Sequence, residues 1–391
     1  MPLINRIAAF SEAMTGWRRH LHAHPEIDMA CHATADFVAA RLTEFGVDSV
    51  TQGIGQTGVV AMIEGRAPGP TVGLRADMDA LPMEEDTGLA HASTRPDAMH
   101  ACGHDGHTAM LLGAARYLAE TRNFAGRVAL VFQPGEEDSG GARFMIEDGL
   151  FETWDMEEIY ALHSLPGVPV GSFHTAPGPI LAAQDDWRID LTGTGGHAAS
   201  PHETADPVAM AAALHQALQT VVSRTVDPVA TAVLSVTQIH AGSAQNVIPA
   251  SAWLSGTVRS FDAAVKATVM ARMAALAEGV AKTFGGQAAM AYTHGYPPTV
   301  NHAGPTTRAA KVAAEISSVV TDMPPTMGAE DFAYMLEKRP GAYLYIGNGN
   351  TPALHHPAYD FDDDALAYGA SFFARLVETR QPLGEPAPTG S

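Results

Sequence analysis

The chain is short of cysteine, of positive charge and of long apolar runs. Only two of its 391 residues are cysteines, Cys31 and Cys102, so the sequence offers no disulfide framework and is typical of a reducing compartment. Lys and Arg number 23 against 43 Asp and Glu, which gives a formal net charge of −20. This balance argues against a nucleic-acid partner, because phosphate binding needs clustered Lys and Arg.

Two further absences concern membranes and export. No stretch reaches the roughly 18 uninterrupted apolar residues that a membrane span requires, so we expect no membrane partner. Near the start of the chain, Arg18 and Arg19 follow the apolar residues instead of preceding them, so we expect no signal peptide. Together with the cysteine content, these features predict a cytoplasmic protein.

What the chain does contain is typical of a well-packed globular protein. Apolar residues make up 46% of the sequence and charged residues 17%. A length of 391 residues is large for one hydrophobic core, so two domains are expected. The tail from residue 381 is rich in Pro and Gly and predicts no packed structure.

From residue 55 to 180, apolar strands alternate with helical stretches, of which residues 104–120 are one. This order predicts an α/β fold built on a mixed, mainly parallel sheet. Polar residues follow the strands: residues 75–79 follow one, Glu136 and Glu137 the next, and His163 a third. Because ligand crevices lie at the carboxyl ends of parallel strands, we expect these three loops to face one cleft.

The pattern changes near residue 186. A strand, a helix, two strands, a longer helix and a final strand follow one another up to about residue 293. This βαββαβ order is ferredoxin-like and predicts an inserted domain at residues 186–295. Residues 1–185 and 296–391 would then form the other domain.

Metal-binding side chains are dense in the first domain. Cys102 and His104 lie two residues apart, Glu137 and His163 follow strands, and His355 lies near the C-terminus. Taken alone, Cys-x-His is more often a pair of core residues, and an acidic run is more often a solvated turn. Five such donors from four loops exceed one tetrahedral site, but they suit two ions that share a ligand. Glu136 would then be free to act as a base.

Eight segments come in the order and spacing of the M20 peptidase family, and resemble most its amidohydrolase branch of hippurate hydrolases, aminoacylases and auxin-conjugate hydrolases. They cover nearly the whole chain and lie at residues 74–82, 100–107, 133–137, 161–163, 196–202, 246–249, 328–332 and 354–357.

The resemblance implies two divalent ions per subunit, zinc or manganese, with cobalt and nickel as further options. It implies Glu136 as the catalytic base and a homodimer, or a tetramer, in which the inserted domain serves as lid and dimerisation unit. His197 would reach the neighbouring subunit's site and stabilise the oxyanion. Cys102 is expected to bridge the ions, whose implied ligands are Cys102, His104, Glu137, His163 and His355.

The remaining implied residues orient ligands or hold the substrate. Asp79 and His107 would support the ligands from behind. Asn246 and Arg259 would grip the substrate's α-carboxylate, and Gly328 would shape the loop beside the leaving amine. The expected reaction is hydrolysis of an N-acyl amino acid, hippurate-like, N-acetyl or aryl-acyl, to a carboxylate and a free amino acid. The alternatives are a dipeptidase or carboxypeptidase of the same family, and a non-catalytic protein that binds acyl-amino acids.

Overall fold

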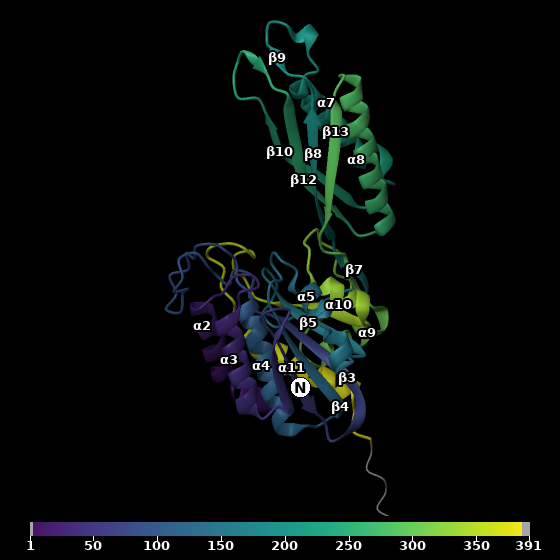
Figure 1. The fold of residues 1–391 in the computed structure, drawn as a ribbon. Coiled ribbons are helices and arrows are strands. Elements are labelled where there is room, and N and C mark those ends of the chain that lie inside the picture. The colour runs from purple at the N-terminus through teal and green to yellow at the C-terminus, as the bar shows by residue number, and fades with distance from the viewer. Residues whose placement is uncertain (1–2, 385–391) are drawn as a thin grey trace, which may run out of the picture. The chain divides into compact units, whose positions relative to one another are not determined.

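The computed structural model describes residues 3–384, which form two compact units (Figure 1). Unit 1 comprises Met1–Ile180, Thr299–Pro324 and Glu330–Ser391, and unit 2 comprises Leu181–Pro298 and Pro325–Ala329. Unit 2 therefore begins five residues before the predicted boundary, because strand β8 already starts at Ala183. The boundaries at 186 and 295 stay a prediction, and residues 385–391 of the predicted tail lie outside the described residues.

Unit 1 is built on an eight-stranded sheet in the order β1-β2-β4-β3-β5-β16-β6-β15. The pairs β3–β4, β3–β5, β5–β16 and β6–β15 are parallel, and the other pairs are antiparallel. The mixed, mainly parallel α/β sheet is thus confirmed. The strands are β1 Ser49–Ile54, β2 Gly58–Glu64, β3 Ala67–Asp77, β4 Ala125–Gln133, β5 Glu158–Leu165, β6 Phe173–His174, β15 Val319–Val320 and β16 Gly341–Gly347.

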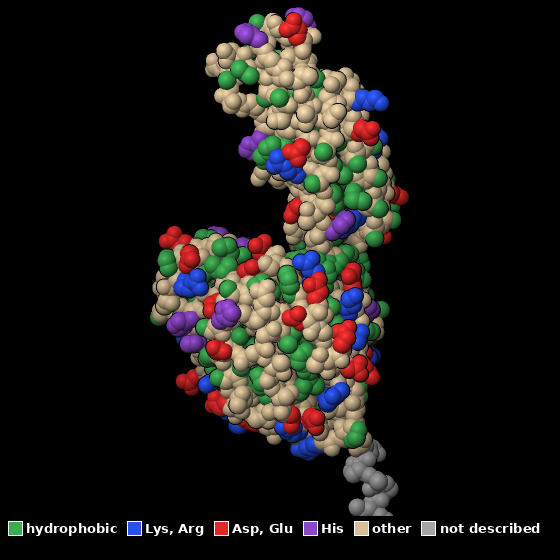
Figure 2. All heavy atoms as spheres, in the orientation of Figure 1, with side chains coloured by type: hydrophobic (Ala, Val, Ile, Leu, Met, Phe, Trp, Pro, Cys, Tyr) green, Lys and Arg blue, Asp and Glu red, His purple; other side chains and the backbone are tan. Residues whose placement is uncertain are grey.

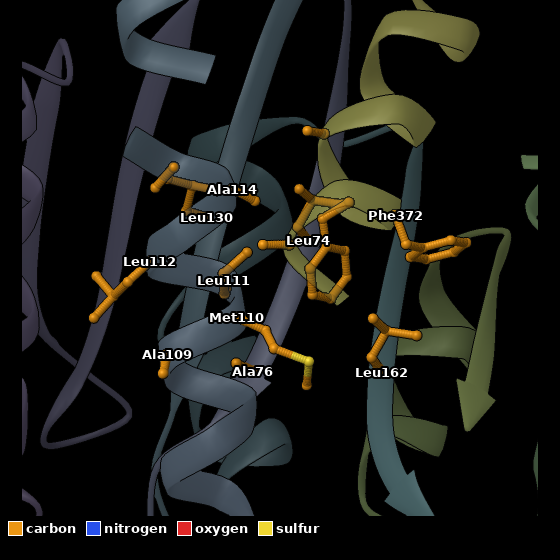
Figure 3. Close-up of a cluster of buried hydrophobic side chains, with 14 of the residues drawn as sticks. Leu74, Ala76, Ala109, Met110, Leu111, Leu112, Ala114, Leu130, Leu162 and Phe372 are labelled. Atoms are coloured by element: carbon orange, nitrogen blue, oxygen red, sulfur yellow. The ribbon is translucent and has the colours of Figure 1, made fainter. Parts of the chain in front are cut away.

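One face of this sheet packs against helices through a single apolar cluster. Figure 3 shows Leu74 of β3 and Leu162 of β5 beside Met110 and Leu111 of α4 and Phe372 of α11. Each fully buried side chain of this size stabilises the fold by roughly 1.5–3 kcal/mol. The helices that contribute to the cluster are α1 Asn5–Ala8, α2 Ser11–Ala23, α3 His32–Phe45, α4 His104–Thr121, α9 Ala303–Ile316 and α11 Ala365–Arg380.

Helix α4 is buried on nearly all sides rather than on one inner face. Every residue from His104 to Ala115 is buried, because α2, α3 and α11 pack around the helix as well as β3. The first turn of α4 is therefore held rigidly, and this turn carries His104.

The side chains that alternate with the apolar cluster point to the opposite face. Arg75, next to Leu74 in β3, lies 5.6 Å from the ring of Phe332 in α10 (Phe332–Lys338). Helix α10 contacts α5 (Gly141–Glu147), which contacts α6 (Leu150–Trp154). A two-stranded sheet of β7 (Gly178–Leu181) and β14 (Thr299–Asn301) completes the described elements of this unit.

Unit 2 is a four-stranded antiparallel sheet in the order β10-β12-β8-β13. Its chain order is β8 Ala183–Thr192, α7 Pro207–Thr225, β10 Ala232–Ala241, β12 Ser251–Ser260, α8 Ala263–Thr283 and β13 Gln287–His294. This is the βαββαβ arrangement. The core cluster joins one face of the sheet to both helices, with Ile189 and Leu254 packed near Leu214 and Met273.

Local sequence explains where the helices of unit 2 begin. The carboxylates of Asp206 and Asp262 accept hydrogen bonds from backbone N–H groups in the first turns of α7 and α8. Such N-caps contribute about 1 kcal/mol each. A short ribbon of β9 (Gly196–His197) and β11 (Val247–Ile248), with the 3-10 turn Pro201–Glu203, extends from the end of β8.

Acidic side chains are dispersed over the visible face of unit 1 and do not gather in one patch (Figure 2). Within residues 3–384, none of the helices combines the length and apolar character needed to cross a bilayer.

Candidate metal centre

The polar side chains at the carboxyl end of the sheet come from four loops and one strand. Asp77 is the last residue of β3, and Glu136 and Glu137 follow β4. His163 lies inside β5, which runs on to Leu165, whereas the sequence placed it after the strand. The extension arises because β16 pairs with β5 as far as Leu165.

Gly103 sets the geometry between Cys102 and His104. Its φ is +88°, and an added Cβ would lie 2.6 Å from both the Ser164 hydroxyl and the Tyr359 hydroxyl. Only glycine fits this left-handed position without strain. The turn places Cys102 just before α4 and His104 at its first residue.

All five sequence-predicted metal ligands come together in unit 1. Among the residues from 3 to 384, one group of donor atoms within 4.8 Å of one another comprises Cys102, His104 and His163. A second comprises Cys102, Glu137 and His355. Cys102 belongs to both groups, which is the arrangement that a ligand bridging two ions requires.

The distances between donors are short. Cys102 Sγ lies 3.3 Å from His163 Nε2, and His355 Nε2 lies 3.4 Å from Glu137 Oε2. His104 Nε2 lies 3.8 Å from Glu137 Oε1. His355 adopts φ +63° and donates its backbone N–H to the carbonyl of Ala101, which ties its loop to the Cys102 segment.

Several buried polar atoms here have no hydrogen-bond partner in the described part of the chain. They include both ring nitrogens of His104 and one carboxylate oxygen each of Asp79 and Glu137. Leaving such an atom unsatisfied costs about 1–3 kcal/mol. Thiolate, imidazole and carboxylate are all donors for borderline-soft divalent cations, so these residues fit a pair of such ions.

The electrostatics of the centre favour added positive charge. Burial lowers the pKa of His104, but the nearby carboxylates of Asp77, Asp79 and Glu137 outweigh burial and raise the pKa to about 10. Burial, followed by repulsion from Glu330 and Glu137, raises the pKa of Glu136 well above its usual range. A pocket with this excess of carboxylates is one that cations stabilise.

The two residues expected behind the ligands both contact this centre. Asp79 Oδ1 lies 3.4 Å from His104 Nδ1, and Asp79 Oδ2 accepts the backbone N–H of Glu137 at 3.1 Å. His107 Nδ1 lies 2.6 Å from Asp77 Oδ1. Asp79 therefore touches two proposed ligands, and His107 touches none of them directly through these bonds.

Arg75 and its partners form a buried network that sequence reasoning did not assign. The Arg75 guanidinium is fully buried and donates to Asp77 at 2.7 Å, to Glu330 at 3.0 Å and to Asp331 at 3.1 Å. Glu330 and Asp331 in turn lie within reach of Glu136. The signal in the sequence was a charged residue inside an apolar strand, because buried charges need partners.

Unit 2 carries the remaining predicted residues, and it separates them. His197 and Asn246 lie on the β9–β11 ribbon, where the Ala198 N–H donates to the Asn246 carbonyl at 3.1 Å. Arg259 pairs with Gln184 near the start of β8, whereas the ribbon follows Thr192 at its end. At about 3.3 Å per residue, this is about 26 Å. Within one copy, Asn246 and Arg259 do not lie together as a carboxylate grip.

The other two observations on unit 2 are local. Burial lowers the pKa of Arg259, against the opposing effect of Asp186 and Asp185. The Gly328 carbonyl accepts the N–H of Ala182 at 2.9 Å, and a Cβ at Gly328 would lie 3.2 Å from the Leu181 side chain. Gly328 is thus packed against the segment that leads into β8.

Comparison with protein families places the chain. Residues 73–379 match the peptidase family M20/M25/M40, and the chain belongs to this family.

Curated relatives share about two fifths of their residues with it over almost their whole length. An N-acetyl-L-cysteine deacetylase of Bacillus subtilis (strain 168) is 40% identical over 96% of this chain and 89% of the relative. A hippurate hydrolase of Campylobacter jejuni is 38% identical over 96% and 99%. A thermostable carboxypeptidase of Saccharolobus solfataricus is 37% identical over 96% and 98%.

A solved structure has the same fold. A Bacillus subtilis protein, described as a dinuclear metal-binding peptidase of the M20 family, is 34% identical and superposes with a TM-score of 0.85. The match covers 96% of this chain and 99% of that one.

Proposed function

We propose that this protein is a dinuclear metal-dependent amidohydrolase that cleaves the amide bond of N-acyl amino acids to a carboxylate and a free amino acid. The observation that carries the proposal is the arrangement around Cys102. This thiol belongs to two donor groups, while Glu136 lies beside them and outside both. The similarity to an N-acetyl-L-cysteine deacetylase and a hippurate hydrolase supports the substrate class.

Cys102, His104, Glu137, His163 and His355 would hold the ions, with Cys102 shared between them. Two bound divalent cations would polarise the scissile carbonyl and acidify the attacking water. The thiolate favours zinc, while imidazole and carboxylate also accept manganese, cobalt or nickel. Asp79 would orient His104 and the Glu137 loop through its contacts with both.

Glu136 would act as general base and proton shuttle. Its carboxylate is 6% exposed, and its raised pKa suits a group that takes a proton from water and gives it to the departing amine. The Arg75 network would keep Glu330 and Asp331 in place beside it.

We also propose a homodimer, in which unit 2 is the lid and dimerisation part; a tetramer of such dimers is the alternative. The wide separation of Arg259 from the His197 ribbon supports this. One copy of unit 2 cannot present both ends of β8 to a single small substrate. His197 of one copy would stabilise the oxyanion in the other copy's site.

The chemistry of recognition follows from the residue types. The planar guanidinium of Arg259 pairs with a carboxylate through two parallel hydrogen bonds, and Asn246 adds a donor from the other copy. Gly328 would shape the amine side of the pocket. We propose a cytoplasmic location on the cysteine content alone.

The carboxypeptidase relative supports a second candidate, because it is nearly as similar as the deacetylase. A dipeptide differs from an N-acyl amino acid by its free amine. Assaying N-acetyl and N-benzoyl amino acids against dipeptides, on protein reconstituted with each metal, separates the two. Faster hydrolysis of the dipeptides would replace the proposed substrate class with the alternative.

Replacing Glu136 by Gln tests the mechanism. We expect metal content to stay at the wild-type level and kcat to fall about 100- to 10,000-fold, the usual contribution of a general base. Asp138→Asn is the matched control, because Asp138 lies in the same acidic run but is exposed, and it should keep wild-type kcat. Near wild-type turnover of the Gln variant would refute the mechanism, and no turnover by the wild type would favour the binding-protein alternative.

A further inference from the structure

His107 is buried one turn along α4 from His104, and both of its ring nitrogens are engaged. Nδ1 lies 2.6 Å from Asp77 Oδ1, and Nε2 lies 2.8 Å from the backbone nitrogen of Ser164. Its side chain is 1% exposed. With no nitrogen left over, His107 is not available to hold an ion, although it lies near Asp77 and His104.

The partners of His107 determine where its proton lies. A backbone N–H can only donate, so the Ser164 N–H requires Nε2 to accept. Nδ1 must then carry the proton and donate it to the Asp77 carboxylate. The ring is thus held in one tautomer by a donor on one side and an acceptor on the other.

The other main-chain group of Ser164 holds a proposed ligand. The Ser164 carbonyl lies 2.8 Å from His163 Nδ1, so it accepts the Nδ1 proton. The lone pair of His163 is then on Nε2, which lies 3.3 Å from Cys102 Sγ. Ser164 therefore bonds to His107 through its N–H and to His163 through its carbonyl.

We propose that His107 is a positioning residue for the metal centre: it fixes the Ser164 main chain, which orients His163 with Nε2 directed at the shared thiol. The inference rests on the ligand set of the proposed function. It gives His107 a specific task, which is to set the tautomer and direction of a ligand in a different strand.

The origin of this chain of bonds is itself held firmly. Asp77 Oδ2 accepts from Arg75 Nη1 at 2.7 Å, and the Asp77 carbonyl accepts from the Thr108 hydroxyl at 2.8 Å. All these groups are buried, so water does not compete for the bonds. Contacts of this kind behind a metal ligand are commonly worth 10- to 100-fold in metal affinity.

Two variants of His107 separate its two bonds. An Asn side chain can place its NH2 where Nδ1 lies and keep the bond to Asp77, but it is too short to reach Ser164. A Gln side chain can place its carbonyl oxygen where Nε2 lies and keep the Ser164 bond, but it no longer donates to Asp77.

We expect His107→Asn to lower zinc affinity about 10- to 100-fold and His107→Gln to lower it no more than about threefold. Affinity is measured by competition with a chromophoric chelator, which needs no substrate. Thr108→Val is the control, because it removes a buried bond to the same Asp77 without touching His107, and it should match the wild type. Equal losses in both variants, or a larger loss in the Gln variant, would overturn the proposal.

A second measurement does not depend on metal binding. In the metal-free wild type, 15N correlation spectra should show the proton of His163 on Nδ1, and His107→Asn should let the two tautomers interconvert. A wild-type His163 with its proton on Nε2 would sink the inference, even if both variants failed to fold. If the wild type bound no zinc but His163 showed the expected tautomer, the proposed function would fail while the positioning contact stood.

Discussion

His22 is fully buried in unit 1 between two carboxylates. Its Nδ1 lies 2.8 Å from Asp105 Oδ2, and its Nε2 lies 3.3 Å from Glu85 Oε1. Burial lowers the pKa of His22, but the hydrogen bonds to Asp105 and Glu85 outweigh it and raise the pKa to about 9. The imidazolium form therefore contributes to the stability of the fold.

This contribution depends on pH in a defined direction. Because the folded-state pKa of His22 is raised, its stabilisation is complete below about pH 6.5 and is lost as the pH rises through 9. We expect wild type to exceed His22→Gln in free energy of unfolding by about 3 kcal/mol at pH 6, and the difference to narrow by pH 9. Denaturant melts at fixed metal concentration measure this.

His24→Gln provides the comparison, since His24 lies two residues on and is exposed. Its free energy of unfolding should follow that of wild type at each pH. An advantage of His22 that stayed constant, or grew, between pH 6.5 and 9 would contradict the prediction.

The sequence predicted the individual metal ligands better than their supports. Cys102, Glu137 and His163 stand out because a strand or turn isolates each from apolar neighbours. The bond between His107 and Ser164 could not be foreseen, because it exists only since β3 and β5 are neighbours in the sheet. Sequence spacing does not give the order of parallel strands.

The loop after β4, which carries Glu136 and Glu137, is held by the segment around Met29. Gly135 has φ +66°, and a Cβ there would clash with Met29 Sδ and lie 3.1 Å from Asp28 Oδ1. Asp28 also accepts hydrogen bonds from the backbone N–H and the hydroxyl of Ser139, at 3.2 and 2.7 Å. The loop therefore has little freedom to move.

Gly135→Ala should displace this loop. We expect a loss of about 2–4 kcal/mol in the free energy of unfolding, from backbone strain and from overpacking against Met29. We also expect kcat to fall at least tenfold, because a small misplacement of a catalytic group is costly. Denaturant melts and steady-state kinetics test the two effects.

Gly88→Ala isolates the strain. Gly88 has φ +67°, but an added Cβ there meets nothing within 4 Å. It should lose only about 1–2 kcal/mol and keep its kcat. If Gly135→Ala behaved like Gly88→Ala in both measurements, the bracing of the loop by Met29 would be disproved.

The elements themselves were largely visible in the sequence. The helix expected over residues 104–120 is α4, and the βαββαβ order appears in unit 2. The end of β5 was misjudged because its last residues are held by pairing with β16, which is far along the chain. The burial of α4 on all sides was also missed, since three other helices supply it.

Unit 2 presents an unpaired edge strand, β10, in which Ile239 is 47% exposed. Exposed edges of this kind are sites at which a second chain can add. If His197 acts in the other subunit, two inactive chains should rescue each other. Co-expressed His197→Ala and Glu136→Gln chains should then give about a quarter of wild-type activity, since half the dimers are mixed and each has one complete site.

Each variant expressed alone sets the background for this experiment. Activity of the mixture no higher than that background would mean that His197 does not act across subunits. The sequence alone suggested a joint role for Asn246 and Arg259, and it could not show their separation. That separation follows from the register of β8 and β12, which the chain order does not specify.

The membership of Cys102 in both donor groups has a consequence for oxidative chemistry. A thiol that is oxidised to a sulfinic acid no longer offers a thiolate, and the change is not reversed by ordinary reductants. Because one sulfur serves both groups, a single oxidation would disable the whole centre of that subunit rather than half of it. The side chain is only 6% exposed, so access of peroxide to this one atom would set the lifetime of the enzyme under oxidative stress.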